Sequence, residues 1–153
     1  MKPRQRARVL ALQALFEIDS VGHDPNEVVQ RRLATDPLPS SAAQLMQSLV
    51  YGVLDRQEEL DALIARHAPD WPVEQLPIVD RNILRMAIWE LIAPESDTPV
   101  RVAINEAVEL AKLFGSESSP RFINGVLGAV VRTLALEAPP KSNTQRDRVS
   151  LSK

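Results

Sequence analysis

Few side chains in this sequence could do catalytic chemistry, and none stands at the spacing that common catalytic or metal sites require. The chain has no cysteine, which excludes disulfides, thiolate metal sites and cysteine nucleophiles. A serine nucleophile would need one of the two histidines as its base. His23, however, lies in an expected turn, and His67 lies beside an expected helix end, where a histidine is favourable for dipole reasons alone. We therefore predict no catalytic residue, no metal, no cofactor and no enzyme activity.

The clearest chemical signal is the placement of charge. Residues 1–8 carry +4 with no acid, residues 139–153 carry +3, and residues 9–138 hold ten basic against nineteen acidic residues. An acidic body with basic ends indicates a polyanion bound at the ends and a basic partner on the body, although basic termini can also serve only solubility. Because arginine donors match phosphate oxygens, residues 1–8 are predicted to be a nucleic-acid-binding arm, through Lys2, Arg4, Arg6 and Arg8.

A second basic position lies at the start of the last expected helix. Ser118, Ser119 and Arg121 stand where free backbone N–H groups and the helix dipole favour a phosphate. The alternative is that Ser119 only caps the helix and that Arg121 is only hydrated. Bases of single-stranded RNA are usually read by stacking, for which Phe16 and Phe122 are candidates. Core packing is the competing interpretation for both rings, because each lies on an apolar helix face.

Apolar residues recur at three-and-four spacing almost throughout, which predicts helices and no sheet. Proline-marked caps and stops divide the chain into about seven helices, the stretch 41–67 forming one long helix or two nearly continuous ones. The expected architecture is therefore all-α, a compact helical bundle over residues 9–138. Gly125 and Gly128, three apart inside the last helix, predict close approach of a neighbouring helix. Residues 139–153 are predicted to be a disordered basic tail.

Neither a membrane span nor a targeting signal is expected. No apolar run approaches the length that a membrane-spanning helix needs. The basic start followed by an apolar run resembles a secretory signal, but Gln13 and Glu17 interrupt the run and no small-residue cleavage site follows. We interpret the segment as a helix of a cytoplasmic protein.

Three segments resemble the NusB family of transcription antitermination factors. The first is Arg-Ala-Arg at 6–8 running into Gln-Ala-Leu-Phe at 13–16, and the second is Leu-Arg-Met-Ala-Ile-Trp-Glu-Leu at 84–91. The third, which is highly specific for the family, joins Val-Ala-Ile-Asn-Glu-Ala-Val-Glu-Leu-Ala-Lys-Leu-Phe-Gly at 102–115 to Arg-Phe-Ile-Asn-Gly-Val-Leu at 121–127. The resemblance covers about residues 4–136.

The resemblance implies two helical subdomains packed across one another, and a function that composition alone does not give. Members of the family are not enzymes. They bind the box A element of nascent ribosomal RNA leaders as single-stranded RNA, together with the ribosomal protein NusE, and act within the RNA polymerase antitermination complex. Some members self-associate, so the resemblance also allows a homodimer. A protein-interaction scaffold, or a regulatory module in ribosomal RNA maturation, is the alternative function.

The family resemblance also assigns roles to residues. It makes the arm, with Lys2, Arg4, Arg6 and Arg8, the principal RNA-contacting segment, and Ser118 with Arg121 a secondary one. Asp80 stands at a position where contact with NusE is expected. Family members often have an acid where this chain has Ser118 or Gly128, and these changes are expected to alter RNA affinity and the packing of the last helix, respectively.

Overall fold

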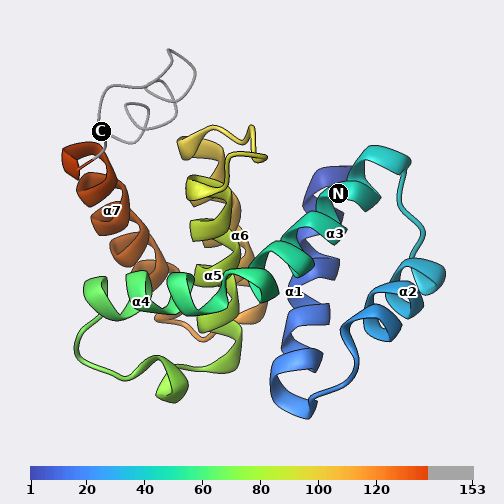
Figure 1. Ribbon diagram of the computed structural model, residues 1–153, viewed down its shortest axis with the longest axis horizontal. Helices are drawn as coiled ribbons and strands as arrows, with labels where there is room; N and C mark the ends of the chain where they lie inside the picture. The colour runs from blue at the N-terminus through green and yellow to red at the C-terminus, as the bar shows by residue number, and fades with distance from the viewer. Residues whose placement is uncertain (138–153) are drawn as a thin grey trace.

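The computed structural model describes residues 1–137, and every regular element in that range is a helix (Figure 1). This confirms the all-helical expectation. The predicted tail at 139–153 lies outside the described residues. The elements are α1 (Pro3–Val21), α2 (Pro25–Thr35), α3 (Ser40–Asp55), α4 (Gln57–His67), the short 3-10 helix η1 (Val73–Gln75), α5 (Ile78–Ile92), α6 (Val100–Phe114) and α7 (Ser119–Glu137).

Local sequence signals set most of the helix boundaries. The Asp24 side chain caps α2 by accepting a hydrogen bond from the Glu27 backbone N–H at 3.1 Å, with Pro25 as the first helical residue. Gly22 ends α1 in the left-handed region, at φ 79°, which glycine adopts without steric cost. The stretch 41–67 proves to be two helices, because Arg56 leaves the helical conformation at φ −114° and ψ 23°.

The helices form two groups that meet along α5. In Figure 1, α1, α2 and α3 lie on one side and α4, α6 and α7 on the other. Helix α1 packs against both α2 and α3, α6 packs against α7, and α5 packs against α1 and α3 as well as α4, α6 and α7. This arrangement agrees with the expected two subdomains. No helix within residues 1–137 is long and apolar enough to span a membrane.

Because α5 is central, its polar residues need partners inside the protein. Asn82, Arg85 and Glu90 are each at most 5% exposed. The Arg85 guanidinium donates to Asp19 of α1 at 3.0 Å and to Asp61 of α4 at 2.7 Å. These bonds tie helices of both groups to α5, and replacing one partner would leave a buried charge without its counterpart.

The close contact between helices occurs at Gly52, not at the glycine pair of α7. A Cβ added at Gly52 would lie 2.3 Å from Trp89 Nε1, so α3 can meet the α5 indole only through a glycine. A Cβ at Gly125 would have no neighbour within 4 Å, and one at Gly128 would meet only the Arg132 guanidinium at 3.4 Å. The expectation of close approach at Gly125 and Gly128 is therefore wrong: Gly125 is exposed and Gly128 only half-buried.

Candidate nucleic-acid interface

The predicted basic arm is part of α1. The helix begins at Pro3, which suits the first helical position because it has no N–H to leave unsatisfied. Lys2 is the N-cap residue, and Arg4 lies in the first turn; both side chains are exposed. Their charges stand at the positive end of the helix dipole, beside backbone N–H groups that have no partner within the helix. This end of α1 is therefore a positively charged, exposed surface.

Arg6 is engaged with the protein itself. Its guanidinium contacts Asp36 Oδ1 at 2.5 Å and donates to the Pro37 carbonyl at 2.9 Å. The side chain keeps 34% of its exposure, so the ion pair is accessible to water and to salt. Arg6 thus links α1 to the segment after α2 through Nη2.

Arg8 lies in the interior, which differs from the expectation that all four basic residues form a solvated arm. Its side chain is 4% exposed, and its guanidinium donates to both carboxylate oxygens of Glu90, at 2.9 and 3.0 Å. A carboxylate oxygen of Glu106 in α6 lies 3.9 Å from Arg8 Nη1. The physical reason is helical geometry: once the helix starts at Pro3, position 8 falls on the same face as Leu12 and Leu15 and points toward α5.

The turn between α6 and α7 presents Ser118 and Arg121 to solvent, whereas Ser119 is buried. The Ser119 hydroxyl accepts from the Ser116 backbone N–H at 2.9 Å and donates to Asp80 Oδ1 at 2.8 Å. Ser119 is therefore a structural residue of the turn, and of the three residues predicted here only Ser118 and Arg121 are exposed.

Asp80 is 5% exposed, so the structure places it behind the surface at which a partner contact was expected. Burial raises the pKa of its carboxyl group, while the hydrogen bond from Ser119 acts in the opposite direction. Asp80 holds the start of α7 against the start of α5. It can influence a partner only through the residues that it positions.

The two candidate stacking rings differ in exposure. Phe16 is 41% exposed, whereas Phe122 is half-buried and packs against the core. Phe16 faces a cleft of about 290 Å³ that it shares with Val79 and Phe114. Phe114 is itself 39% exposed and was not among the expected site residues. One feature of the sequence could have indicated it: Phe114 is a large apolar residue at the last position of α6, past the helices that cover the other apolar residues of α6.

A charged cluster beside Phe16 was also not expected. Glu17 accepts from His23, from Arg31 and from Arg32, the Arg32 distance being 3.1 Å. The hydrogen bond with His23, followed by those from the two arginines, lowers the pKa of Glu17 to about 2. Two arginines around one carboxylate leave this cluster with positive charge next to an exposed aromatic ring. Its residues come from α1, from α2 and from the loop between them, so spacing in the sequence could not reveal it.

The other histidine, His67, connects two helices. His67 contacts the Leu63 carbonyl through Nδ1 at 2.9 Å and the Thr133 hydroxyl through Nε2 at 2.8 Å, joining α4 to α7. Across residues 1–137, no group of three or more His, Cys, Asp and Glu residues is arranged to hold a metal ion.

The chain is similar to known proteins over most of its length. The model of the NusB family matches residues 5–132. The "Transcription antitermination protein NusB" of Roseiflexus sp. (strain RS-1) is 50% identical over 129 residues, covering 84% of this chain and 91% of that protein. The protein of the same name from Chloroflexus aggregans (strain MD-66 / DSM 9485) is 48% identical over 129 residues, covering 84% of this chain and 86% of that protein.

A solved structure described as antitermination factors NusB and NusE in complex with dsRNA is similar in fold. The similarity has a TM-score of 0.77 at 30% sequence identity, and it covers 87% of this chain and 98% of that one.

Proposed function

The chain belongs to the NusB family, and we propose that it is an RNA-binding transcription antitermination factor and not an enzyme. The observation that carries this proposal is the 50% identity, across 84% of the chain, to a protein named for transcription antitermination. Its RNA ligand would be the box A element of ribosomal RNA leaders, and its protein partner the ribosomal protein NusE. Such a factor acts with RNA polymerase in the cytoplasm.

The RNA backbone would be bound at two places. Lys2 and Arg4 offer two exposed cations at the positive end of α1, and Arg121 offers a third beside Ser118 at the start of α7. Arg6 would join them, because its side chain is 34% exposed and its contacts within the protein use Nη2 alone. Arg8 contributes by holding α1 in place through Glu90, since its own donors are buried. With so few free cations, strong RNA binding would depend on the protein partner.

Phe16 would supply a stacking surface for a base. The ring is exposed, and it is carried on the same rigid helix as the basic N-terminus, about 18 Å along the axis from Arg4. Stacking on an aromatic ring is the usual way in which an unpaired base is held. Arg32 of α2 lines the same cleft as Phe16, and together with Arg31 it would attract the adjoining RNA backbone.

The partner would bind the helical body and not the basic end of α1. Residues 9–138 hold nearly all the acid of the chain, and a basic ribosomal protein would be attracted to that surface and repelled by residues 1–8. Asp80 would act indirectly, by fixing the turn that presents Ser118 through its bond with Ser119.

Transcription in vitro tests the proposal. Purified RNA polymerase transcribes a template that carries a box A element upstream of a terminator, with the chain, NusE and the other antitermination factors present. We expect readthrough to rise when the chain is added, and to fall when Arg4 and Arg121 are both replaced by alanine. Readthrough that is the same with an intact and a scrambled box A would overturn the proposal.

A further inference from the structure

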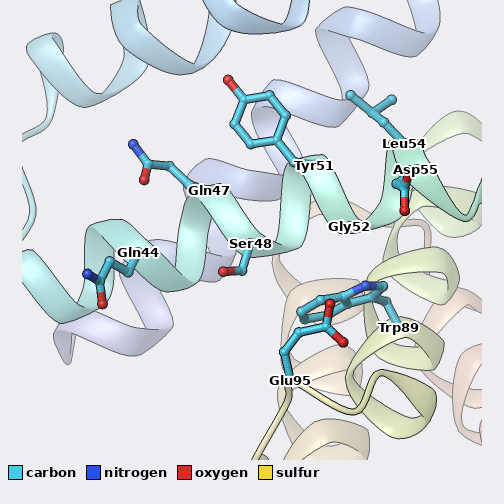
Figure 2. A pocket seen from close by; sticks show the side chains of 9 residues that line it. All are labelled: Gln44, Gln47, Ser48, Tyr51, Gly52, Leu54, Asp55, Trp89 and Glu95. Carbon is cyan, nitrogen blue, oxygen red and sulfur yellow. The ribbon is translucent and has the colours of Figure 1, made fainter.

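Two cavities of this protein differ in how their charged residues are buried. A broad trough of about 860 Å³ runs beside α3, and its acids, Asp55 and Glu95, are exposed to solvent (Figure 2). A much smaller cavity, of about 10 Å³, lies where α1, α5 and α6 meet and has Arg8, Glu90 and Glu106 in its wall. Charged groups held inside a protein need polar partners, so the small cavity is the one that calls for an occupant.

The Arg8 guanidinium is paired with Glu90 through only two of its three nitrogens. Nε and Nη2 donate to the two Glu90 oxygens, at 2.9 and 3.0 Å. Nη1 lies 3.9 Å from Oε1 of Glu106, which is beyond hydrogen-bond distance. A separation of this size between two charged groups is one that a water molecule can bridge.

Glu106 stands between the cavity and the surface. On its outer side, a groove of about 320 Å³ separates Gln5 and Val9 of α1 from Leu113 of α6. Glu106 and Leu110 line both the groove and the cavity, and the Glu106 side chain keeps 20% of its exposure. The groove therefore brings solvent to a carboxylate that also faces Arg8.

We propose that the cavity holds one ordered water molecule, which accepts a hydrogen bond from Arg8 Nη1 and donates one to Glu106. The cavity, at about 10 Å³, has the space that a single water needs. A water about 2.8 Å from both atoms spans their 3.9 Å separation with an angle of about 90° at its oxygen, so neither helix has to move. Its second proton is available to Glu90, because a carboxylate has about four acceptor sites and Arg8 uses two.

Other states of the cavity fit less well. A metal ion would be repelled by the Arg8 guanidinium, and the described residues contain no group of three or more His, Cys, Asp and Glu that could hold one. Cavities that stay empty are apolar, whereas this one has three charged side chains in its wall. A direct hydrogen bond between Arg8 and Glu106 would need the two groups to approach by about 1 Å.

The water would join α1 to α6, two helices that both pack against α5. Arg8 then connects three helices, to α5 through Glu90 and to α6 through the water and Glu106. Arg4 lies one turn before Arg8, so the bridge also fixes the exposed start of α1 relative to α6. The inference does not depend on the proposed function, since neither RNA nor a protein partner takes part in it.

A crystal structure of the full chain at about 1.5 Å resolution tests the inference directly. We expect an ordered water at about 2.6–3.2 Å from both Arg8 Nη1 and a Glu106 oxygen. An empty cavity would overturn the inference. So would a direct hydrogen bond between Arg8 and Glu106.

Two variants of Glu106 test what holds the water. Glu106→Gln keeps an oxygen acceptor and should keep the water in its crystal structure, whereas Glu106→Leu has no acceptor and should lose it. In urea unfolding, Glu106→Gln should raise the unfolding equilibrium constant by about fivefold, as expected when a hydrogen bond loses its charge. Glu109→Gln is the matched control on α6, because the Glu109 side chain is 55% exposed and pairs with exposed Lys112; it should change the constant less than about twofold. A water that stays in Glu106→Leu, or equal effects of Glu106→Gln and Glu109→Gln, would show that Glu106 does not hold it.

Discussion

The Arg8 guanidinium and the Glu90 carboxylate form a two-pronged, buried ion pair that joins α1 to α5. The residues are 82 positions apart in the sequence, and both side chains are at most 4% exposed. The pair fixes α1 against the central helix α5. Arg8, which the sequence predicted to be an RNA contact, is therefore part of the protein interior.

Replacing Arg8 by alanine should therefore destabilise the fold. Replacing Arg8 removes two hydrogen bonds and a positive charge from the buried Glu90 carboxylate, and breaking a buried ion pair in this way typically costs about 3–5 kcal/mol. Urea unfolding of Arg8→Ala measures this, with Arg4→Ala as the matched control, because exposed Arg4 should change stability by less than about 0.5 kcal/mol. If Arg8→Ala unfolds like the wild type and loses only RNA affinity, Arg8 is an RNA contact.

Two glycines should respond in opposite ways to the same substitution. Gly52→Ala places a Cβ 2.3 Å from the Trp89 indole, and the forced repacking should cost about 1–3 kcal/mol. Gly125→Ala places a Cβ in open space on a helix, and the gain in helix propensity should stabilise by up to about 1 kcal/mol. Thermal unfolding of both variants checks the pair, and a stabilised Gly52→Ala would contradict the packing described here.

Glu17 should contribute stability that disappears in acid. Its pKa is lowered from 4.5 to about 2 in the folded chain, chiefly by the hydrogen bond with His23 and by those from Arg31 and Arg32. A lowered pKa means that the stabilisation is complete above pH 4.5 and is lost as the pH falls toward 2. The difference in unfolding free energy between the wild type and Glu17→Gln should shrink over that range. Parallel curves down to pH 2 would show that Glu17 is not held by these partners.

The exposed Phe16 should matter to RNA and little to stability. Phe16→Ala should weaken RNA affinity by about fivefold to a hundredfold if a base stacks on the ring, with a small effect on unfolding. Phe122→Ala should instead destabilise the chain, because that ring packs against the core. Filter binding and unfolding of both variants separate the two roles. Weaker binding of NusE with unchanged RNA binding would assign Phe16 to the protein partner.

The sequence predicted the helices well because their signals are local. Caps, prolines and apolar spacing are properties of neighbouring residues, and they place α2, α5, α6 and α7 close to their observed starts. The start of α1 was missed because the polar residues 3–8 carry no complete apolar stripe, although Pro3 suits a first helical position. Arg8 was consequently expected in solvent.

The site could be predicted only in part, because burial and pairing depend on helices that are distant in the sequence. No spacing rule connects Arg8 with Glu90, or Glu17 with Arg31. The exposed positions Lys2, Arg4 and Arg121 remain predicted RNA contacts. A double Arg6→Ala/Arg8→Ala variant cannot serve as a simple test of the basic arm, because it also removes a buried ion pair.

The most direct test of the central claim is the affinity of the chain for box A RNA, measured with and without NusE over a range of salt concentrations. We predict weak binding by the chain alone, with log K falling against log salt at a slope of about −2, as expected for three single-strand phosphate contacts. With NusE, box A RNA should bind at least about tenfold more tightly than a scrambled RNA. Equal affinity of the complex for the two RNAs, or no binding to either, would contradict the assignment as an RNA-binding antitermination factor.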